Sequence, residues 1–277
     1  KKIIMKKTNY LKELSLSAEV VKRGLVNKKA DVEKIQSWLC LQERQHRGIG
    51  TMTGIDGDFG TATELAVKNY QRFLGLPADG VVTTSLFSKL TLNLKKSFES
   101  VEKKTNLRDT ISEVAHNHLK GFPFELVIKQ QTNCGPWVRS YMGGNEGANW
   151  LWCMGFVQAV LDQATSLHGK KITDIMPISY SCDTVGTYGV QKNVLIRNEK
   201  IRNNPALVKK GDVLLVRKSQ NDWIHTAIIV DVVGDAFVTI EGNTNNDGSS
   251  NGDGVYKRVR NFRKSILDVF SMDNWLV

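Results

Sequence analysis

Residues 226–240 read Thr-Ala-Ile-Ile-Val-Asp-Val-Val-Gly-Asp-Ala-Phe-Val-Thr-Ile, which is two β-rich runs joined by a short turn. Runs of the same kind lie at 212–216 and 255–259, and segments rich in Gly, Asn and Asp separate them. Short strands between turn residues are typical of an antiparallel sheet. Helical patterns precede this region, so the order of elements predicts an α+β fold with helices packed on an antiparallel sheet.

The chain divides into four segments by its patterns. Residues 29–93 show apolar residues at helical spacing and two Asp-Gly turns that each lead into a helix, which predicts a small three-helix domain with a weak internal repeat. Residues 1–28 form a basic segment in which lysines interrupt any apolar core, so no signal peptide is visible. Residues 94–107 are charged, as in a solvated linker or an exposed helix, and 108–277 form the second domain.

The composition limits the classes of partner. The 277 residues carry a formal net charge of +10, which favours nucleic acid, lipid headgroups or the anionic polymers of a bacterial wall. Lys and Arg are scattered without the basic, aromatic-interleaved motif of a nucleic-acid reader, so we do not expect nucleic-acid binding. No apolar stretch of about 18 residues occurs, so we expect no membrane span. We also expect a monomer.

Cys153 begins an apolar, helix-periodic run, Cys-Met-Gly-Phe-Val-Gln-Ala-Val, directly after Trp152. A free Cys on such a stripe is commonly a packing residue. At a helix N-terminus, however, unsatisfied amides favour the thiolate, and a nearby His lowers the pKa of the thiol further. A thiolate of this kind attacks an amide carbonyl. Cys153 is therefore either a core residue or a nucleophile.

His225 is the candidate partner of this thiol, although a lone His at a strand edge is commonly structural. The next hairpin turns at 233–235, and a loop of about three residues would place His225 opposite Asn243, with Glu241 diagonal to it on the same face. A two-residue loop would put Glu241 on the opposite face. Catalysis by this pair therefore requires an odd-length loop or a bulge in the hairpin.

With that geometry these residues would form the site of a cysteine hydrolase. His225 would take the thiol proton and later protonate the leaving amine, while Glu241 or Asn243 orients the ring by accepting its other N–H. The backbone N–H of Cys153 would donate to the oxyanion.

The three-helix domain carries a recognisable pattern. Residues 54–63 read Gly-Ile-Asp-Gly-Asp-Phe-Gly-Thr-Ala-Thr, and residues 66–82 read Ala-Val-Lys-Asn-Tyr-Gln-Arg-Phe-Leu-Gly-Leu-Pro-Ala-Asp-Gly-Val-Val. This pattern resembles the peptidoglycan-binding domain that accompanies many wall hydrolases. The resemblance covers residues 29–93 and implies that this domain holds the bacterial wall, whereas periodicity alone supports a generic three-helix domain.

The second domain resembles the CHAP family, which comprises cysteine- and histidine-dependent amidohydrolases and peptidases with a compact papain-like fold. The resemblance covers about residues 108–277. Its motifs are Trp152-Cys-Met-Gly-Phe-Val157, Lys210-Gly-Asp-Val-Leu-Leu215, His225-Thr-Ala-Ile-Ile-Val230, Ile240-Glu-Gly-Asn-Thr-Asn245 and Gly252-Asp-Gly-Val-Tyr256. Upstream, Asn133-Cys-Gly-Pro-Trp-Val138 resembles the stretch before the nucleophile in one branch of the family.

This resemblance implies a role for each matching residue. Cys153 would be the nucleophile, His225 the base, and Glu241 with Asn243 the orienting polar groups. The predicted substrate contacts stand in or beside the motifs and are Asn133, Trp152 and Trp223. Family members commonly have a small residue and a Gly where this chain has Met154 and Ala227.

Several other residues receive structural interpretations. The remaining cysteines lack metal-ligand spacing and are interpreted as buried small hydrophobes, with a bridge between the last two left open: Cys40, Cys134 and Cys182. His116 and His118 are assigned to surface or capping roles on a helix at about 108–119. The segment 243–253 is rich in oxygen ligands, and some family members bind calcium, but turn chemistry explains this composition equally well. We predict no metal and no cofactor.

The leading hypothesis is a peptidoglycan hydrolase, in which the first domain holds the wall and the second cleaves an amide through an acyl-enzyme on Cys153. The bond would be the N-acetylmuramoyl-L-alanine amide or one in the stem peptide or cross-bridge, because the same triad serves amidase and endopeptidase. The alternatives are a non-catalytic wall-binding protein and an amidase acting on a soluble peptide conjugate. We expect action at the cell wall, after phage-lysin-like release or secretion.

Overall fold

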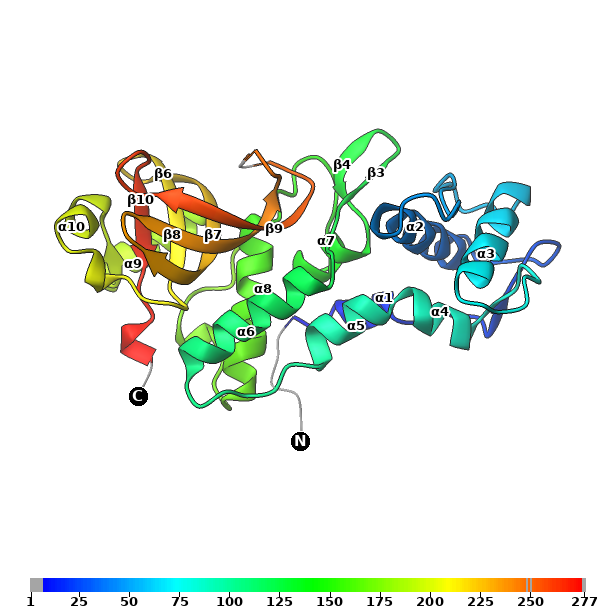
Figure 1. The fold of residues 1–277 in the computed structure, drawn as a ribbon, viewed down its shortest axis with the longest axis horizontal. Coiled ribbons are helices and arrows are strands. Elements are labelled where there is room, and N and C mark those ends of the chain that lie inside the picture. The colour runs from blue at the N-terminus through cyan, green and yellow to red at the C-terminus, as the bar shows by residue number, and fades with distance from the viewer. Residues whose placement is uncertain (1–6, 248, 250, 276–277) are drawn as a thin grey trace.

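The computed structural model describes residues 7–247, 249 and 251–275, and Figure 1 shows their arrangement. The predictions made for the first six residues, and for parts of the oxygen-rich segment and the C-terminus, lie outside the described residues. The fold is α+β, as the order of patterns predicts. A helical N-terminal part packs beside a larger part that is built on an antiparallel sheet.

Within the described residues, six antiparallel strands form the sheet of the larger part, in the order β5-β10-β6-β7-β8-β9. The central strands are rich in Val and Ile and are buried on both faces along much of their length, as expected for strands covered by other elements. The strand bounds are β5 (Leu195–Ile196), β6 (Val213–Ser219), β7 (Asp222–Val233), β8 (Ala236–Thr244), β9 (Gly254–Asn261) and β10 (Leu267–Phe270).

The central helix α8 (Cys153–Leu167) packs against β7 and β8, with α6 (Leu107–Lys120) also against it. Every residue from Cys153 to Thr165 is buried, which identifies α8 as a core helix. Gly242 in β8 permits the close approach, because a Cβ there would lie 2.6 Å from the Cβ of Phe156. The other elements of this part are β3 (Leu126–Ile128), β4 (Gln131–Cys134), α7 (Pro136–Tyr141), α9 (Cys182–Gln191), α10 (Asn198–Asn203) and the 3-10 turns Ile172–Asp174, Pro205–Leu207 and Asp273–Trp275.

The N-terminal domain has its three predicted helices, and its internal repeat is structural. The side chain of Gln36 donates to Asp56 Oδ1 at 2.8 Å and accepts from the backbone N–H of Gly57 at 2.9 Å. Gln71 makes the same pair of contacts at the second turn, to Asp79 and Gly80, at 2.6 and 2.9 Å. Each Asp-Gly turn is therefore held by a buried Gln of a preceding helix. The helices are α2 (Lys29–Gln45), α3 (Thr61–Phe73) and α4 (Thr84–Leu90).

The basic segment before this domain runs across both parts of the molecule, and we call residues 7–21 the strap. At one end, the backbone N–H of Lys7 donates to Asp162 of α8 at 2.7 Å. In the middle, α1 (Tyr10–Glu13) presents Glu13 to Arg139 of α7, with two hydrogen bonds of 2.8 Å. At the other end, β1 (Val20–Val21) pairs with β2 (Val82–Thr83) beside α4. The strap therefore ties the helices of the N-terminal domain to the sheet domain.

Where the sequence predicts a solvated linker or an exposed helix at 94–107, the structure has a helix with one buried face. Helix α5 (Leu92–Glu99) fills the first part of this segment, and its Leu94 and Phe98 are buried. The Phe98 ring stacks on Tyr10 at 4.3 Å and meets the edge of His118 at 4.8 Å. The spacing of Leu94 and Phe98 gives this short helix an apolar face. The junction between the domains is therefore packed.

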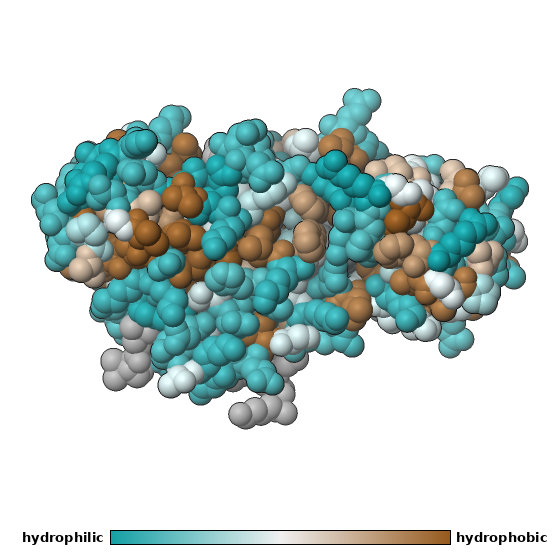
Figure 2. Space-filling view, viewed as in Figure 1, coloured by the Kyte–Doolittle hydropathy of each residue, from teal (hydrophilic) through white to brown (hydrophobic). Residues whose placement is uncertain are grey.

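The two domains also contact each other directly. Trp38 of α2 meets Trp137 of α7 edge to face at 6.3 Å, and Arg44 forms an ion pair with Asp253. The Arg44 guanidinium also lies over the Phe124 ring at 4.2 Å. Beside these contacts, a cleft of about 740 Å³ is lined by α2 and by the β3–β4 hairpin. Figure 2 shows a mainly hydrophilic surface, with hydrophobic side chains gathered over the sheet domain and the N-terminal domain.

Truncating the buried face of α5 tests whether the junction is packed. We expect Phe98→Ala to lower the free energy of unfolding by about 3–5 kcal/mol, because it leaves a cavity among aromatic rings. The matched control is Leu92→Ala in the same helix, where the side chain is 41% exposed and the loss should stay within about 0.5 kcal/mol. Denaturant unfolding measures both. Equal, small effects would mean that the segment behaves as a solvated linker.

Candidate active site

The register of the β7–β8 hairpin brings His225 and Glu241 together, by a route that the sequence left open. Val233 pairs with Ala236, so the loop has two residues, Gly234 and Asp235. A β-bulge in β7 then shifts the register between Ile229 and Asp231, which adds one residue to that strand. The bulge reverses the alternation of side chains. An odd-length loop or a bulge is needed to put His225 and Glu241 on the same face, and the structure has the bulge.

Glu241 lies at the centre of a buried polar network. His225 Nε2 is 2.9 Å from Glu241 Oε2, and the exposed fractions of the two residues are 1% and 0%. Arg260 of β9 donates to both carboxylate oxygens, from Nε at 2.9 Å and Nη2 at 2.5 Å. Thr239 Oγ1 donates to Glu241 Oε1 at 2.5 Å. A buried carboxylate requires partners of this kind, because burial without them is costly.

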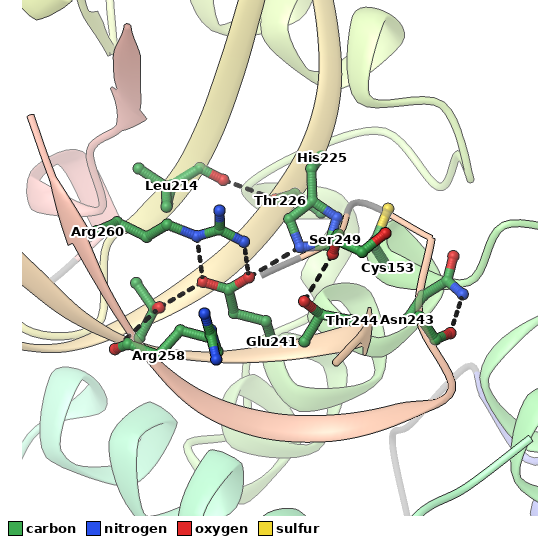
Figure 3. A network of polar contacts seen from close by, with 12 residues as sticks. Cys153, Leu214, His225, Thr226, Glu241, Asn243, Thr244, Ser249, Arg258 and Arg260 are labelled. Carbon is green, nitrogen blue, oxygen red and sulfur yellow. Dashed lines mark hydrogen bonds and ion pairs between the residues drawn. The ribbon is translucent and has the colours of Figure 1, made fainter. Parts of the chain in front are cut away.

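The other ring nitrogen of His225 is directed at the thiol. His225 Nδ1 has no hydrogen-bond partner within the described residues, and Figure 3 shows it pointing toward the Cys153 sulfur. Cys153 is the first residue of α8, where the helix N-terminus favours a negative charge. Thiol, imidazole and carboxylate therefore lie in a line, in the order that nucleophilic catalysis requires.

The protonation states follow from these contacts. A hydrogen bond with Cys182 lowers the pKa of the Cys153 thiol well below its usual range, against the cost of burial and with the help of His225. Burial lowers the pKa of His225, but its contacts with Cys153 and Glu241 raise it to about 9. Burial raises the pKa of Glu241, but Arg260 and His225 bring it down to about 2. The directions of these pKa shifts favour a thiolate, an imidazolium and a carboxylate at neutral pH.

Asn243 supports the loop before Cys153 instead of orienting the imidazole. Its Oδ1 accepts from the backbone N–H of Trp152 at 3.2 Å, and its Nδ2 donates to Asn133 Oδ1 at 3.0 Å. The Asn243 backbone has a φ of +56°, a left-handed conformation in which Asn is enriched. Of the two orienting groups that the sequence allowed, the structure places Glu241 against the ring.

The three predicted substrate contacts are buried, which is a difference from the sequence prediction. Trp152 and Asn133 are fully buried, and Trp223 is 3% exposed. Trp152 Nε1 donates to Glu125 Oε2 at 2.9 Å, and Trp223 Nε1 donates to Asp268 Oδ2 at 3.0 Å. In this conformation the three side chains stabilise the surroundings of Cys153 and His225 and offer almost no surface to a substrate.

The structure bears on two further interpretations. Cys134 and Cys182 are buried, as predicted, and both are free, so no bridge joins them; Cys182 in addition touches the Cys153 sulfur. His118 is not at the surface: it is fully buried between the Tyr141 hydroxyl and Gln163 Oε1, each at 3.0 Å. Burial lowers the pKa of His118 to about 4, so its ring is neutral at physiological pH.

The oxygen-rich segment shows turn chemistry in its described part. Asn245 Oδ1 accepts from the backbone N–H groups of Asp247 and Ser249, each at 3.0 Å. Thr244 Oγ1 donates to the Ser249 carbonyl at 2.7 Å. These contacts are typical of Asx turns and explain why Asn and Ser recur here.

Three neighbours of the site are not among the residues predicted from the sequence. Arg260 and Thr239 hold Glu241, and Cys182 touches the Cys153 sulfur. Thr239 and Glu241 are two apart in one strand, so alternation could have placed them on one face. Arg260 and Cys182 depend on strand pairing and helix packing, which leave no local signal.

Comparison with known proteins bears on the N-terminal domain. The model of the peptidoglycan binding domain family matches residues 28–90. The chain carries a peptidoglycan-binding domain. The match overlaps the predicted domain of residues 29–93 and supports association with the cell wall, with peptidoglycan as the partner. No curated protein and no solved structure matches the chain. Among the described residues, none of the helices is long and apolar enough to cross a membrane.

Replacing the carboxylate tests the charge network. We expect Glu241→Gln to move the pKa of His225 from about 9 toward its ordinary value of 6.5, because the ring loses a negative neighbour while Arg260 stays close. A pH titration of the imidazole signals by NMR measures this.

The matched control for this titration is Glu125→Gln. Glu125 is also buried, but it contacts Trp152 and Asn133 instead of His225. Its substitution should leave the His225 titration near 9. An unchanged His225 pKa in Glu241→Gln would show that the carboxylate does not support the imidazolium.

Proposed function

We propose that this protein is a peptidoglycan hydrolase that cleaves an amide bond of the bacterial wall through a covalent acyl-enzyme on Cys153. The observation that supports this most directly is the order of Cys153, His225 and Glu241, with the thiol at the start of a core helix and the carboxylate 2.9 Å behind the imidazole. The peptidoglycan-binding domain supplies the substrate class. The resemblance of the second domain to papain-like CHAP enzymes agrees with this chemistry.

The proposed reaction begins with the thiolate–imidazolium pair. The Cys153 sulfur attacks the carbonyl carbon of the scissile amide, and the oxyanion is stabilised by the backbone N–H at the start of α8. His225 Nδ1 then gives its proton to the leaving nitrogen, and the C–N bond breaks. A water molecule, deprotonated by the neutral His225, attacks the thioester and releases Cys153.

Glu241 acts in this scheme without changing its own protonation. With a pKa of about 2 it remains a carboxylate. Its hydrogen bond keeps a proton on His225 Nε2 and holds the ring so that Nδ1 faces the sulfur. Arg260 and Thr239 hold the carboxylate still. The low exposure of the pair keeps bulk water away, which strengthens the attraction between its charges.

The binding domain would raise the local concentration of wall at the catalytic domain. The two domains are packed together, because the strap, α5 and the Trp38–Trp137 contact join them. The wall strand would therefore be held at a defined distance from Cys153. Both an amidase and an endopeptidase are compatible with the triad, and the chemistry of the released ends distinguishes them.

Removing the sulfur separates wall binding from wall cleavage. We expect Cys153→Ala to slow the clearing of a suspension of purified peptidoglycan by at least about 1,000-fold, because the covalent step is lost. The same variant should sediment with the wall as the parent does. The matched control is Cys134→Ala, a second buried free Cys, which should keep its activity.

Two outcomes would contradict the hydrolase hypothesis. One is a Cys153→Ala protein that clears the wall as fast as the parent. The other is a parent protein that binds the wall but produces no new chain ends. Mass spectrometry of the digested wall reads those ends. A free lactyl group on muramic acid indicates an amidase, and a new amino-acid terminus with an intact muramoyl amide indicates an endopeptidase.

The rate should depend on pH in a bell shape. The thiol pKa of Cys153 is lowered, so the rate rises on the acid side as the thiolate forms. The imidazolium must still hold its proton, so the rate falls as the pH passes about 9. Initial rates of wall clearance against pH measure both limbs. A rate that keeps rising well above pH 9 would contradict the required imidazolium.

A further inference from the structure

Two thiols meet in the sheet domain although 29 residues separate them in the sequence. The sulfur of Cys153 lies 4.0 Å from the sulfur of Cys182, and both residues are free. Cys153 is the first residue of α8, and Cys182 is the first residue of α9. Each sulfur is therefore at the positive end of a helix dipole, where a thiolate is favoured.

A contact from α8 fixes the segment that leads into α9. The fully buried Gln158 donates from Nε2 to the carbonyl of Pro177 at 2.8 Å. Its Oε1 accepts from the backbone N–H of Ser179 at 3.2 Å. Ser181 then caps α9 by accepting from the backbone N–H of Thr184 at 3.2 Å. The helix that carries Cys153 thus positions the start of the helix that carries Cys182.

Strand β7, which carries His225, holds α9 from the other side. The backbone N–H of Trp223 donates to Asp183 Oδ1 at 2.6 Å, one residue after Cys182. The Trp223 ring packs so closely on α9 that a Cβ at Gly186 would lie 2.5 Å from it. Cys182 is therefore held beside the Cys153 sulfur by contacts from two elements of the core.

The two thiols differ in protonation. The Cys153 thiol has a pKa well below its usual range, so it is the anion of the pair. The pKa of Cys182 lies well above its usual range, first because of its hydrogen bond with Cys153 and then because of burial. A reactive thiolate next to a protonated thiol is the arrangement in which one sulfur is oxidised and the other resolves it.

We propose that Cys153 and Cys182 form a reversible intramolecular disulfide when the protein meets a peroxide, which makes the pair a site of oxidative modification. In the first step, the Cys153 thiolate attacks one oxygen of hydrogen peroxide. The S–O bond forms, the O–O bond breaks, and hydroxide leaves, so sulfur loses two electrons to the peroxide and becomes a sulfenic acid.

In the second step, the Cys182 sulfur attacks the sulfenic sulfur. The S–S bond forms, the S–O bond breaks, and the departing hydroxide takes the Cys182 proton and leaves as water. The main cause of the raised pKa of Cys182 is its hydrogen bond with the Cys153 thiolate. The sulfenic acid is neutral, so that cause is absent at this point. The sulfurs must approach by about 2 Å to reach the length of a disulfide. An external dithiol reduces the bond and restores both thiols.

Geometry selects the partner of an oxidised Cys153. Cys153 is 4% exposed and Cys182 is 8% exposed, so little of either residue faces solvent, and the thiol in contact with the Cys153 sulfur is that of Cys182. The disulfide chemistry rests on the 4.0 Å contact between the two sulfurs and does not need wall cleavage. The consequence that oxidation protects and reversibly switches off a hydrolase rests on the proposed function.

The test counts thiols and therefore does not depend on activity. The intact protein has four free cysteines, and treatment with hydrogen peroxide should leave two titratable thiols after denaturation. Peptide mapping without reduction should find one linked pair, containing Cys153 and Cys182. A dithiol should bring the count back to four.

Three variants distinguish a resolving thiol from general oxidation. Cys182→Ser should fall from three thiols to two, and a dithiol should not restore the third, because the sulfenic acid at Cys153 goes on to irreversible acids. Cys153→Ser should keep Cys182 reduced. Cys134→Ser, the matched control, should still form the Cys153–Cys182 link and drop from three thiols to one.

The proposal is overturned if the parent protein accumulates sulfinic acid at Cys153 with no linked peptide. It is also overturned if Cys40 or Cys134 forms links as readily as Cys182. If the disulfide forms but the reduced protein cleaves no wall, the redox chemistry stands and the proposed hydrolase fails.

Discussion

The buried carboxylate of Glu241 is the constraint on which the sheet domain depends. A carboxylate with no exposed surface would cost several kcal/mol unless hydrogen bonds and opposite charges surrounded it. Its donors come from three strands: His225 from β7, Thr239 from its own strand β8, and Arg260 from β9. These strands must keep their register for the charges to meet. The bulge in β7 therefore brings the charged groups together as well as shaping the sheet.

A second polar layer surrounds this network and faces the loop before α8. Asn243, Asn133 and Glu125 are buried, and they bond to one another's side chains or to Trp152. Networks of this kind raise the cost of any wrong arrangement, because each broken contact leaves a buried polar group without a partner. The position of the Cys153 sulfur is thus determined by residues that do not touch it.

Local sequence predicted the elements well and the long-range contacts less well. The three helices of the N-terminal domain, the antiparallel strands and the helix beginning at Cys153 all have clear periodicity or turn signals. The bulge left no signal, since the residue inserted in the register lies within an ordinary run of Ile and Val. The proximity of Cys182 depends on Gln158 and on Gly186, whose meaning appears only when α9 is in place.

In residues 94–107 the many charged side chains predict exposure, but a few apolar side chains decide the packing. Lys95 and Lys96 dominate the composition, yet Leu94 and Phe98 on the other face decide where the helix lies. Trp152 and Trp223 are predicted to contact substrate but are buried. An aromatic residue beside Cys153 or His225 in the sequence fits a substrate contact and a core residue equally well. Burial, which one sequence does not reveal, separates the two.

The strap has a consequence for the order of folding. Its first contact joins Lys7 to Asp162, 155 residues later, whereas its last, at Val20–Val21, needs the chain only as far as Thr83. On the ribosome the wall-binding helices can close early, but the start of the strap must wait until most of α8 has been made. The two domains become one cooperative unit only after that late docking. A chimera that exchanged the binding domain at residue 93 would separate the strap from one of its two partners, so these domains are less interchangeable than their separate patterns imply.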